Sequence, residues 1–489
     1  MLDIQKRLTN TFYAILSLPA TAMGFALSVQ IAALSWILST QYGLDIHDVG
    51  LVWAAGPLAG IIGQVIIGVI SDKVWFWNGR RRPFIFIGGV LAALMLLALP
   101  NIGIIKASLG IEGILGIAIL VALTLDLAIN VSFNPTRSII ADVTPQGRAR
   151  TKGYTWMQTV SGTFGVLAYL VGALINNYVL IYGGAVLVLL FSVIPPFFIK
   201  EPRVLGNYGD ENAQQSATKN RGSSKNDKAS LVEILRTIRP LWGFLIYAIY
   251  AMIVRLAGIP KIPYHIFEIF ALLITVVLIA EALLKKEDRA TKEENGIIGF
   301  QKVLAAHSFT WVGVQTMFIY LYAFAKDRIP GISDMELGRV VAWSFFSLNL
   351  VAAIIPVTIL EPLAARLGRV KVHAASIAIM AIGYLGILFF GVSPLYIYLL
   401  MAIVGIGWAA TISLPFAIMS QKVPQTRMGL YMGLFNLSVV LPQLVASLGI
   451  GELISEADDK GITFIVCAAT VAFSAIAWTL VKEPADKPS

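Results

Sequence analysis

Long apolar runs separated by short polar stretches repeat along the 489 residues of the chain. A membrane-spanning helix needs about 20 predominantly apolar residues, and the pattern predicts fourteen such helices in an all-α polytopic membrane protein. Six are expected in the first part of the chain, two in the middle and six in the last part. Their predicted ranges are 11–39, 50–72, 83–100, 112–140, 153–176, 178–199, 241–257, 263–284, 304–325, 337–365, 370–391, 394–420, 427–450 and 462–481.

Two polar segments divide this pattern. The first begins at Lys200, and its centre, NYGDENAQQSATKNRGSSKNDKAS, has hardly any large apolar residue. Such a stretch cannot bury a core, so we expect a flexible linker. The second segment, KKEDRATKEEN, follows the middle pair of apolar runs. These boundaries predict an N-terminal six-helix bundle at 1–200, a cytoplasmic linker at 201–303 with an extra hairpin at about 241–284, and a C-terminal six-helix bundle at 304–489.

Composition agrees with a membrane protein. The chain is 57% hydrophobic and 13% charged, with a mean hydropathy of +0.78, whereas a soluble domain carries about 25% charged residues. The net charge of +9 is explained by basic residues on the cytoplasmic side of the membrane, and not by nucleic acid binding. The loops of the other side, YGLDIHD, IPGISDME and ELISEADD, are acidic. We therefore expect both termini in the cytoplasm and a location in the plasma or inner cell membrane.

The same charge rule constrains the middle pair of runs. If one run spanned the membrane and the other did not, the basic loops of the second half would face outward, so both span or neither does. Each run carries one ionisable residue, Arg255 in the first and Glu268 in the second. Two helices lying flat at the membrane interface are the alternative. We expect a spanning hairpin.

A polar stripe crosses the fourth predicted helix, in the stretch LTLDLAINVSFNPTRSIIAD. Because an α-helix turns about 100° per residue, its polar side chains fall within about 80° of one another. An ionisable group at membrane depth is costly and is a functional candidate. Asp126 and Arg137 lie about 16 Å apart along the axis, so they can share a cavity but cannot pair. For Arg137, snorkelling to the interface is an equally open interpretation. The stripe consists of Asp126, Asn130, Asn134 and Arg137.

The two halves look like weak repeats. After the second helix of each half comes an acidic residue, followed by basic residues and a Gly-Arg pair. Charge-assisted hydrogen bonds between these groups would latch two helices together on the cytoplasmic side. Simple topology signalling by positive charge is the alternative. The predicted gate consists of Asp72, Arg80, Arg81 and Arg82 in the first half, and of Glu361, Arg366 and Arg369 in the second.

Several of these stretches resemble a known family. The signature from Asp72 to Gly79-Arg-Arg-Arg-Pro83 resembles the cytoplasmic loop motif of the major facilitator superfamily, in the form found in plant sucrose/proton symporters and their disaccharide-carrying animal and bacterial relatives. LDLAINVSFNPTRSIIAD, ATISLPFAIMS and GLYMGLFNLSVVLPQLVASLG are similar to the fourth, tenth and eleventh helices of that family. The pair Phe133-Asn134 stands where the family commonly has Gln-Gly.

The resemblance implies a major facilitator fold with a substrate site between the halves, near the middle of the bilayer. It implies a proton-coupled symporter that imports a disaccharide, such as sucrose, maltose or a related glucoside, by alternating access. Asp126 would be the proton-binding carboxylate, and Arg137 a charge partner or a residue on the substrate side. The motif at Asp72 and Arg80–Arg82 would form the cytoplasmic gate. An exporter or facilitator of another small solute, and a sugar receptor that no longer transports, are the alternatives.

Elementary chemistry supports these assignments independently. A carboxyl group in apolar surroundings holds its proton more tightly, so it can load and unload near neutral pH. A disaccharide needs many hydroxyl partners and aromatic faces for its rings, although any single polar helix residue more often serves packing. The predicted substrate-binding residues are Arg137, Asn130, Gln30, Gln158, Gln315, Trp343, Asn349, Trp408 and Asn436. Gln64, Gln443 and Trp156 belong to the same pool of candidates.

Other chemistry is not expected. The four histidines have no ligand spacing, so we predict no metal site and no cofactor. The single cysteine, Cys467, excludes an intramolecular disulfide. The loops contain no paired carboxylates and no His/Cys constellation, which argues against an enzyme. The expected partners are a sugar, protons and the lipid bilayer, without nucleic acid, and we expect a monomer.

Overall fold

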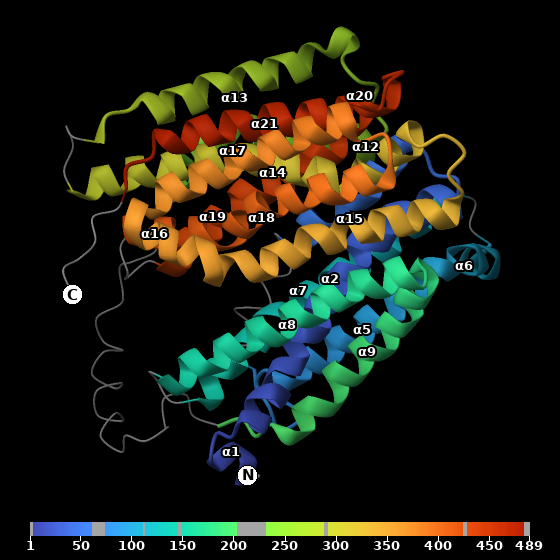
Figure 1. Cartoon of the computed structure of the whole chain (residues 1–489), viewed down its shortest axis with the longest axis vertical. Helices are drawn as coiled ribbons and strands as arrows, with labels where there is room; N and C mark the ends of the chain where they lie inside the picture. The colour runs from blue at the N-terminus through green and yellow to red at the C-terminus, as the bar shows by residue number, and fades with distance from the viewer. Residues whose placement is uncertain are drawn as a thin grey trace. The chain divides into compact units, whose positions relative to one another are not determined.

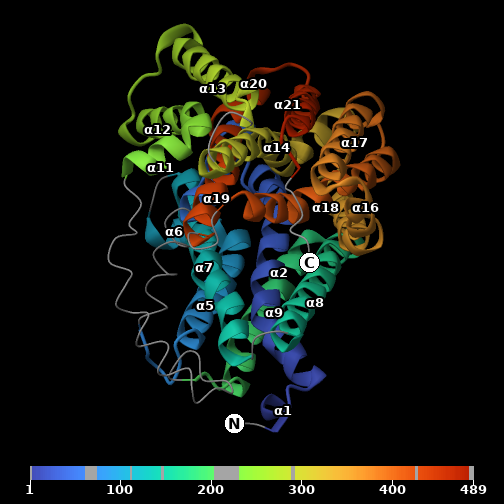
Figure 2. The ribbon, with the colours of Figure 1, turned by 90° about the vertical axis from the view of Figure 1, so that its left-hand side faces the viewer.

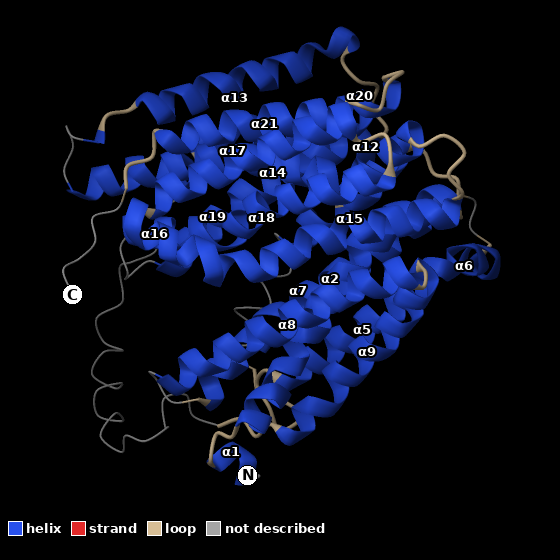
Figure 3. Cartoon of the chain, viewed as in Figure 1, coloured by secondary structure: helices blue, strands red, loops and turns tan. Residues whose placement is uncertain are grey.

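The computed structural model describes residues 3–60, 74–110, 113–144, 148–202, 231–287, 292–423 and 428–483. These ranges are helical apart from short turns, as Figure 3 shows. Among them, the only β feature is an isolated bridge between Phe76 and Gly79. The prediction of an all-helical chain is therefore confirmed for the described residues.

The chain forms two compact units (Figure 1). Unit 1 contains Met1–Tyr42 and Leu58–Ala229, and unit 2 contains Gly43–Pro57 and Ser230–Ser489. A short helix, α3 (Ile46–Trp53), lies between helices of unit 1 in the sequence but packs against α20 (Gly451–Glu456) in unit 2.

Unit 1 is built around α2, which packs against α8 and α9, while α5 packs against α7 and α9 (Figure 2). Two glycines permit close helix contacts, because a Cβ on Gly88 would overlap Ser132 of α7, and one on Gly89 would overlap Ser192 of α9. The elements are α1 (Asp3–Lys6), α2 (Asn10–Thr40), α5 (Arg82–Ala98), η1 (Leu99–Asn101), α6 (Ile102–Leu109), α7 (Ile114–Val143), α8 (Arg148–Leu174) and α9 (Asn177–Phe198).

In unit 2, α14 packs against α19 and α21, and α18 packs against α15 and α17. Besides α3 and α20, its elements are α11 (Leu231–Thr237), η3 (Arg239–Leu241), α12 (Trp242–Ala257), η4 (Pro263–His265), α13 (Ile266–Leu284), α14 (Lys292–Arg328), α15 (Asp334–Ile355), η6 (Pro356–Leu360), α16 (Glu361–Leu367), α17 (Arg369–Phe390), α18 (Pro394–Lys422), α19 (Met428–Val445), η8 (Ala446–Ile450) and α21 (Ile462–Thr479).

Within the described residues, eleven helices are long and apolar enough to cross a membrane. The polytopic fold agrees with the sequence, but the count of fourteen spans is not established. Much of the predicted span 50–72 lies outside the described residues. The run 241–257 forms α12, which has only 16 residues, and 304–325 lies inside the 37-residue α14, which is not among the eleven.

The helices of the predicted hairpin, α12 and α13, belong to unit 2. They approach closely at Gly243, where a Cβ would overlap Thr275, and Tyr250 stacks on Phe267 with ring centroids 3.8 Å apart. Four ionic contacts lie at the two ends of the pair. Arg239 pairs with Glu281 at 2.8 Å, Lys261 pairs with Glu452 of α20, and Glu287 lies 3.3 Å from Lys302 and 3.9 Å from Lys422.

The exposed side of α13 is apolar, and it includes Ile269, Phe270, Leu273 and Val277. A helix that is fixed to its unit on one side and presents large apolar side chains on the other fits contact with lipid. Lys422, the last residue of α18, lies near Glu287 at one end of the hairpin. Burial away from water lowers the pKa of its ammonium group, and the Glu287 carboxylate opposes this shift.

Candidate functional site

A carboxyl group and an amide face each other inside unit 1. Asp126 of α7 is 6% exposed and Gln30 of α2 is 2% exposed. The Gln30 Nε2 donates a hydrogen bond of 3.0 Å to the Asp126 Oδ2. The Gln30 Oε1 is buried and has no hydrogen-bond partner among the described residues. This pair joins two helices by a single polar contact in apolar surroundings.

The amide can serve both protonation states of the carboxyl group. An ionised carboxylate only accepts hydrogen bonds, whereas a protonated one also donates. Gln30 offers its Nε2 to the ionised form. If the side-chain amide turns over, the same residue offers its Oε1 to the protonated form. Because an unsatisfied buried polar atom costs about 1–3 kcal/mol, a partner that can either donate or accept lowers the cost of burying either state of the carboxyl group.

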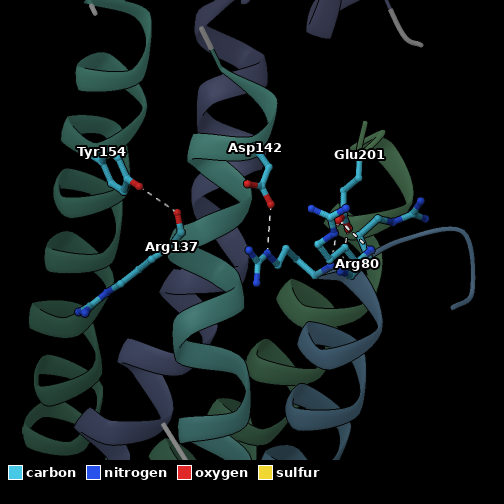
Figure 4. Close-up of polar contacts among 7 residues, drawn as sticks. Arg80, Arg137, Asp142, Tyr154 and Glu201 are labelled. Atoms are coloured by element: carbon cyan, nitrogen blue, oxygen red, sulfur yellow. Dashed lines mark hydrogen bonds and ion pairs between the residues drawn. The ribbon is translucent and has the colours of Figure 1, made fainter. Parts of the chain in front are cut away.

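The remaining residues of the polar stripe lie in other environments. The Asn130 Nδ2 donates to the Asp126 carbonyl at 2.8 Å, within α7. The Arg137 side chain is exposed, and its guanidinium lies 4.2 Å from the centroid of the Phe133 ring. The Tyr154 hydroxyl donates to the Arg137 carbonyl at 3.2 Å (Figure 4). The Asn134 side chain lies outside the described part of the chain.

Near one end of unit 1, a buried ion pair joins the residue just before α5 to α7. The Arg81 Nε donates to the Asp142 Oδ2 at 3.0 Å, and the two side chains are 6% and 10% exposed. In Figure 4 the Asp142 carboxylate faces this guanidinium, while Arg137 points away from it. The predicted gate residue Asp72 lies outside the described residues. Among the described residues, Asp142 is thus one acidic partner of the arginine motif.

A second acid, Glu201, caps the arginine motif directly. Its Oε2 accepts from the backbone N–H groups of Arg80 (2.9 Å) and Arg81 (2.8 Å), and its Oε1 accepts from that of Arg82 (2.8 Å). Figure 4 shows Glu201 beside Arg80 at the start of α5. The first N–H groups of a helix lack intrahelical partners and carry a partial positive charge, so a carboxylate fits this position. A Cβ on Gly79 would lie 2.9 Å from the Glu201 Oε1, which explains the glycine.

Unit 2 repeats this arrangement. Glu483, which follows α21, accepts from the backbone N–H groups of Arg369 (2.7 Å) and Val370 (2.9 Å) at the start of α17. Gly368 has a φ of 94° and approaches the Glu483 carboxylate so closely that a Cβ would lie 2.8 Å from it. The Glu361 and Arg366 side chains are exposed. The structure thus places Glu483, and not Glu361, at the Gly-Arg turn.

Neither capping glutamate was among the predicted site residues. The sequence does carry a signal, because Lys200-Glu201-Pro202 and Lys482-Glu483-Pro484 follow the last helix of each half. A residue near the N-terminus also helps to position Glu201. Gln5 fixes the backbone before Glu201 by accepting from the Lys200 N–H at 3.0 Å and donating to its carbonyl at 2.8 Å.

The substrate candidates of unit 2 lie in several places. The Gln443 Nε2 donates to the Gln315 Oε1 at 3.1 Å, which joins α19 to α14. The Trp408 ring contacts Trp311 and Phe318, with centroids 5.8 Å and 5.3 Å away. The other candidates either form a hydrogen bond within their own helix or are partly or fully exposed. These are Asn349, whose Nδ2 donates to the Phe345 carbonyl at 2.9 Å, and the partly exposed Asn436 and Trp343; Gln158, in unit 1, is exposed.

Within the described residues, no group of three or more His, Cys, Asp or Glu side chains is placed to hold a metal ion. Unit 1 contributes the buried Asp126 carboxyl group and one capped arginine turn, and unit 2 contributes the Gln315–Gln443 amide pair and a second capped turn.

Sequence comparison identifies the class to which this fold and site belong. The family model described as Major Facilitator Superfamily matches residues 16–267, 262–447 and 331–489. Together these matches cover most of the chain, and the chain belongs to the major facilitator superfamily. Members of this family are membrane transporters and not enzymes, so the protein is a multi-pass membrane transporter of a small solute.

Particular relatives refine the picture. The chain is 24% identical to the sucrose transport protein SUC4 of Arabidopsis thaliana over 88% of this chain and 82% of the relative. It is 32% identical to the general alpha-glucoside permease of Schizosaccharomyces pombe, over 29% of this chain and 28% of the permease. Among solved structures, the POT family transporter PepTSo aligns with a TM-score of 0.64 at 13% identity, over 97% of this chain and 98% of that one, which shows the fold. The resemblance to sucrose and glucoside transporters is thus confirmed as distant homology.

Proposed function

We propose that the protein is a proton-coupled symporter that imports a disaccharide, such as sucrose, maltose or a related glucoside. The observation that carries this proposal is the buried Asp126, held by Gln30 in the interior of unit 1. A membrane-embedded carboxyl group with one adaptable partner is suited to bind and release a proton during a transport cycle. The names of the sucrose and alpha-glucoside relatives support the substrate class.

The transport cycle follows from alternating access between two six-helix bundles, each moving as a body around a substrate site near the bilayer midplane. The extra hairpin spans the bilayer beside the C-terminal bundle, which gives fourteen spans with both termini in the cytoplasm. Contacts of Lys261 with Glu452 at one end of the hairpin, and of Glu287 with Lys302 at the other, support a spanning orientation, because they attach both ends of the helix pair to other helices of unit 2. The protein acts as a monomer in the plasma or inner cell membrane.

The two arginine turns form the cytoplasmic gate in this proposal. Glu201 and Glu483 hold the starts of α5 and α17 by backbone hydrogen bonds. The arginine side chains of these turns therefore project from a fixed backbone. A gate needs such fixed points, because its charged side chains must break and remake contacts while the helix ends stay in place.

The experiment that tests the function uses purified protein in liposomes that enclose a pH-sensitive dye. Addition of sucrose or maltose acidifies the lumen if sugar and proton enter together, whereas a non-sugar solute leaves it unchanged. The Asp126→Asn variant is expected to abolish proton-driven sugar accumulation while the protein remains folded. Exchange of labelled sugar across the membrane is expected to persist in this variant, because exchange does not require net proton release.

The matched control is Glu456→Gln, which removes the charge of an exposed carboxyl group in unit 2 and is expected to leave accumulation unchanged. Full accumulation by Asp126→Asn would overturn the assignment of the proton site. Movement of sugar without acidification by the wild-type protein would favour a facilitator. Sugar binding without any movement would favour a receptor on the same fold, and silence with every sugar would point to another solute.

A further inference from the structure

A cavity of about 370 Å³ lies at the end of unit 2 where α14 ends and where α15 and α18 begin. Ligand sites for small molecules usually measure about 300–1,000 Å³, so this cavity is at the small end of the range. It is distinct from the environment of Asp126, which belongs to unit 1. Its lining combines a turn at Gly331, the aromatic rings of Trp343 and Tyr398, and the charged side chains of Glu336 and Arg339.

The helix α15 presents its polar and aromatic lining from one face. Glu336, Arg339 and Trp343 are spaced by three and four residues, which places them in a row along the helix. Tyr398 comes from the first turns of α18, and its ring centroid lies 6.2 Å from that of Trp343 at an interplanar angle of 40°. Two rings that meet at this angle form an open corner and not a closed stack. The corner can therefore receive a flat apolar face.

A helix cap, a glycine turn and an aromatic contact hold the lining residues of the cavity in place. The start of α15 is closed by a capping box, in which the Ser333 Oγ accepts from the Glu336 N–H at 3.3 Å and the Glu336 Oε2 accepts from the Ser333 N–H at 3.1 Å. Both bonds anchor the helix start, and they leave the Glu336 Oε1 outside the box. Gly331, with a φ of 69°, allows the tight turn after α14. The Trp343 ring is braced at its side by Phe346, at 5.3 Å and 87°.

These groups have the chemistry of a carbohydrate site. A sugar ring has an apolar face of C–H groups that packs against aromatic rings, and hydroxyl groups around its edge. A carboxylate accepts hydrogen bonds from hydroxyls and a guanidinium donates to them, so one acidic and one basic side chain can bind adjacent hydroxyls. A phosphate or another anion fits less well, because Glu336 and the neighbouring Asp334 are acidic.

We propose that this cavity is a second saccharide site, in which one glycosyl ring packs against Trp343 and Tyr398. Glu336 and Arg339 form hydrogen bonds with the hydroxyl groups of that ring. The inference rests on the proposed disaccharide symport and names a place where the sugar binds before it reaches the central substrate site. In the proposed orientation the cavity opens to the outside, so it acts as a capture site. A capture site changes the apparent affinity for substrate and does not change the rate of the transport cycle once the substrate is bound.

The test combines equilibrium binding with transport, using the full chain. Binding of maltose, sucrose and methyl α-D-glucoside to purified protein is measured by titration calorimetry, and initial uptake rates are measured in proteoliposomes. We expect Trp343→Leu to remove one binding component and to raise KM by about fivefold or more, while kcat stays within about twofold. Tyr398→Phe keeps the ring and is expected to bind nearly as the wild type does. Phe389→Leu, at the same end of unit 2 but outside the cavity, is the matched control.

The two proposals fail in distinguishable ways. If the wild type takes up sugar while Trp343→Leu leaves both the binding isotherm and KM unchanged, the second site is refuted and the symport stands. A fall in kcat at constant KM would assign Trp343 to the transport step itself and would also refute the capture site. If no sugar is taken up but methyl α-D-glucoside binds in a manner that depends on Trp343, the saccharide site stands and the symport is refuted.

Discussion

Replacing Glu201 by glutamine should release the start of α5. The carboxylate accepts three backbone N–H groups, two on Oε2 and one on Oε1. A glutamine side chain has the same shape, but one of its two oxygens becomes an NH₂ group that cannot accept. In either orientation of the amide, at least one N–H group loses its partner, and the negative charge at the helix N-terminus disappears.

The size of the effect follows from this count. A hydrogen bond to a charged group contributes about 1.5–3 kcal/mol, and every 1.4 kcal/mol is about a tenfold change in an equilibrium constant. Local opening of the first turn of α5 should therefore become roughly ten- to a hundredfold more frequent. The loss of the charge beside the helix dipole adds about 0.3–1 kcal/mol in the same direction.

Hydrogen exchange measured by mass spectrometry is the appropriate assay, because it reports local opening without requiring the whole protein to unfold. The peptide that contains the amides of Arg80 to Arg82 should exchange faster in Glu201→Gln by this factor. Glu483→Gln is the matched control, because it removes the corresponding cap from unit 2. It should accelerate exchange at Arg369 and Val370 while α5 keeps its wild-type rate.

Two results would refute this reasoning. Exchange at Arg80 to Arg82 that stays within about twofold of the wild type would show that the Glu201 contacts do not hold the helix start. Equal acceleration of both helix starts by either variant would show a general loss of stability and not the loss of a specific cap. The exposed Glu456, changed to glutamine, should alter neither region.

Two further predictions concern the interior of unit 1. Gln30→Leu removes the donor that favours the ionised form of Asp126, so the pH at which proton-driven uptake is half-maximal should rise; an unchanged pH profile would contradict the role given to Gln30. Arg81→Met leaves the Asp142 carboxylate buried without its cation, a change that typically costs about 3–5 kcal/mol, so the melting temperature and the yield of folded protein should fall. The double variant Arg81→Met/Asp142→Leu should recover most of that loss, and failure to recover would argue that the pair does not act as a unit.

Most of the long helices could be predicted from the sequence because the length of an apolar run indicates where a membrane-spanning helix begins and ends. Most predicted spans agree with the observed elements, such as 178–199 with Asn177–Phe198 and 370–391 with Arg369–Phe390. The polar stripe could be placed on one face of the fourth helix by its spacing. Spacing does not tell which part of that face is covered by other helices, so the burial of Asp126 and the exposure of Arg137 had to come from the structure.

Contacts between distant segments were harder to predict. The acid next to the arginine motif in sequence is Asp72, but the contacts that the structure describes come from Asp142 and Glu201, about 60 and 120 residues away. Such partners depend on how the helices pack, and local patterns carry no information on packing. The repeated Lys-Glu-Pro sequence was the available signal, and it becomes meaningful only when the end of each half is seen to return to the start of its third helix.

The repeated cap has a consequence for how the gene can be divided. In each unit, a carboxylate that follows the last helix closes on the start of an earlier helix of the same unit, so the covalent chain that joins the units adds nothing to either closure. A cut between residues 202 and 231 leaves both closures complete. Each half thus closes its own cap, but the same cut leaves α3 on the first fragment while α20, against which it packs, is on the second. Two separately translated half-transporters would therefore complete unit 2 only by associating.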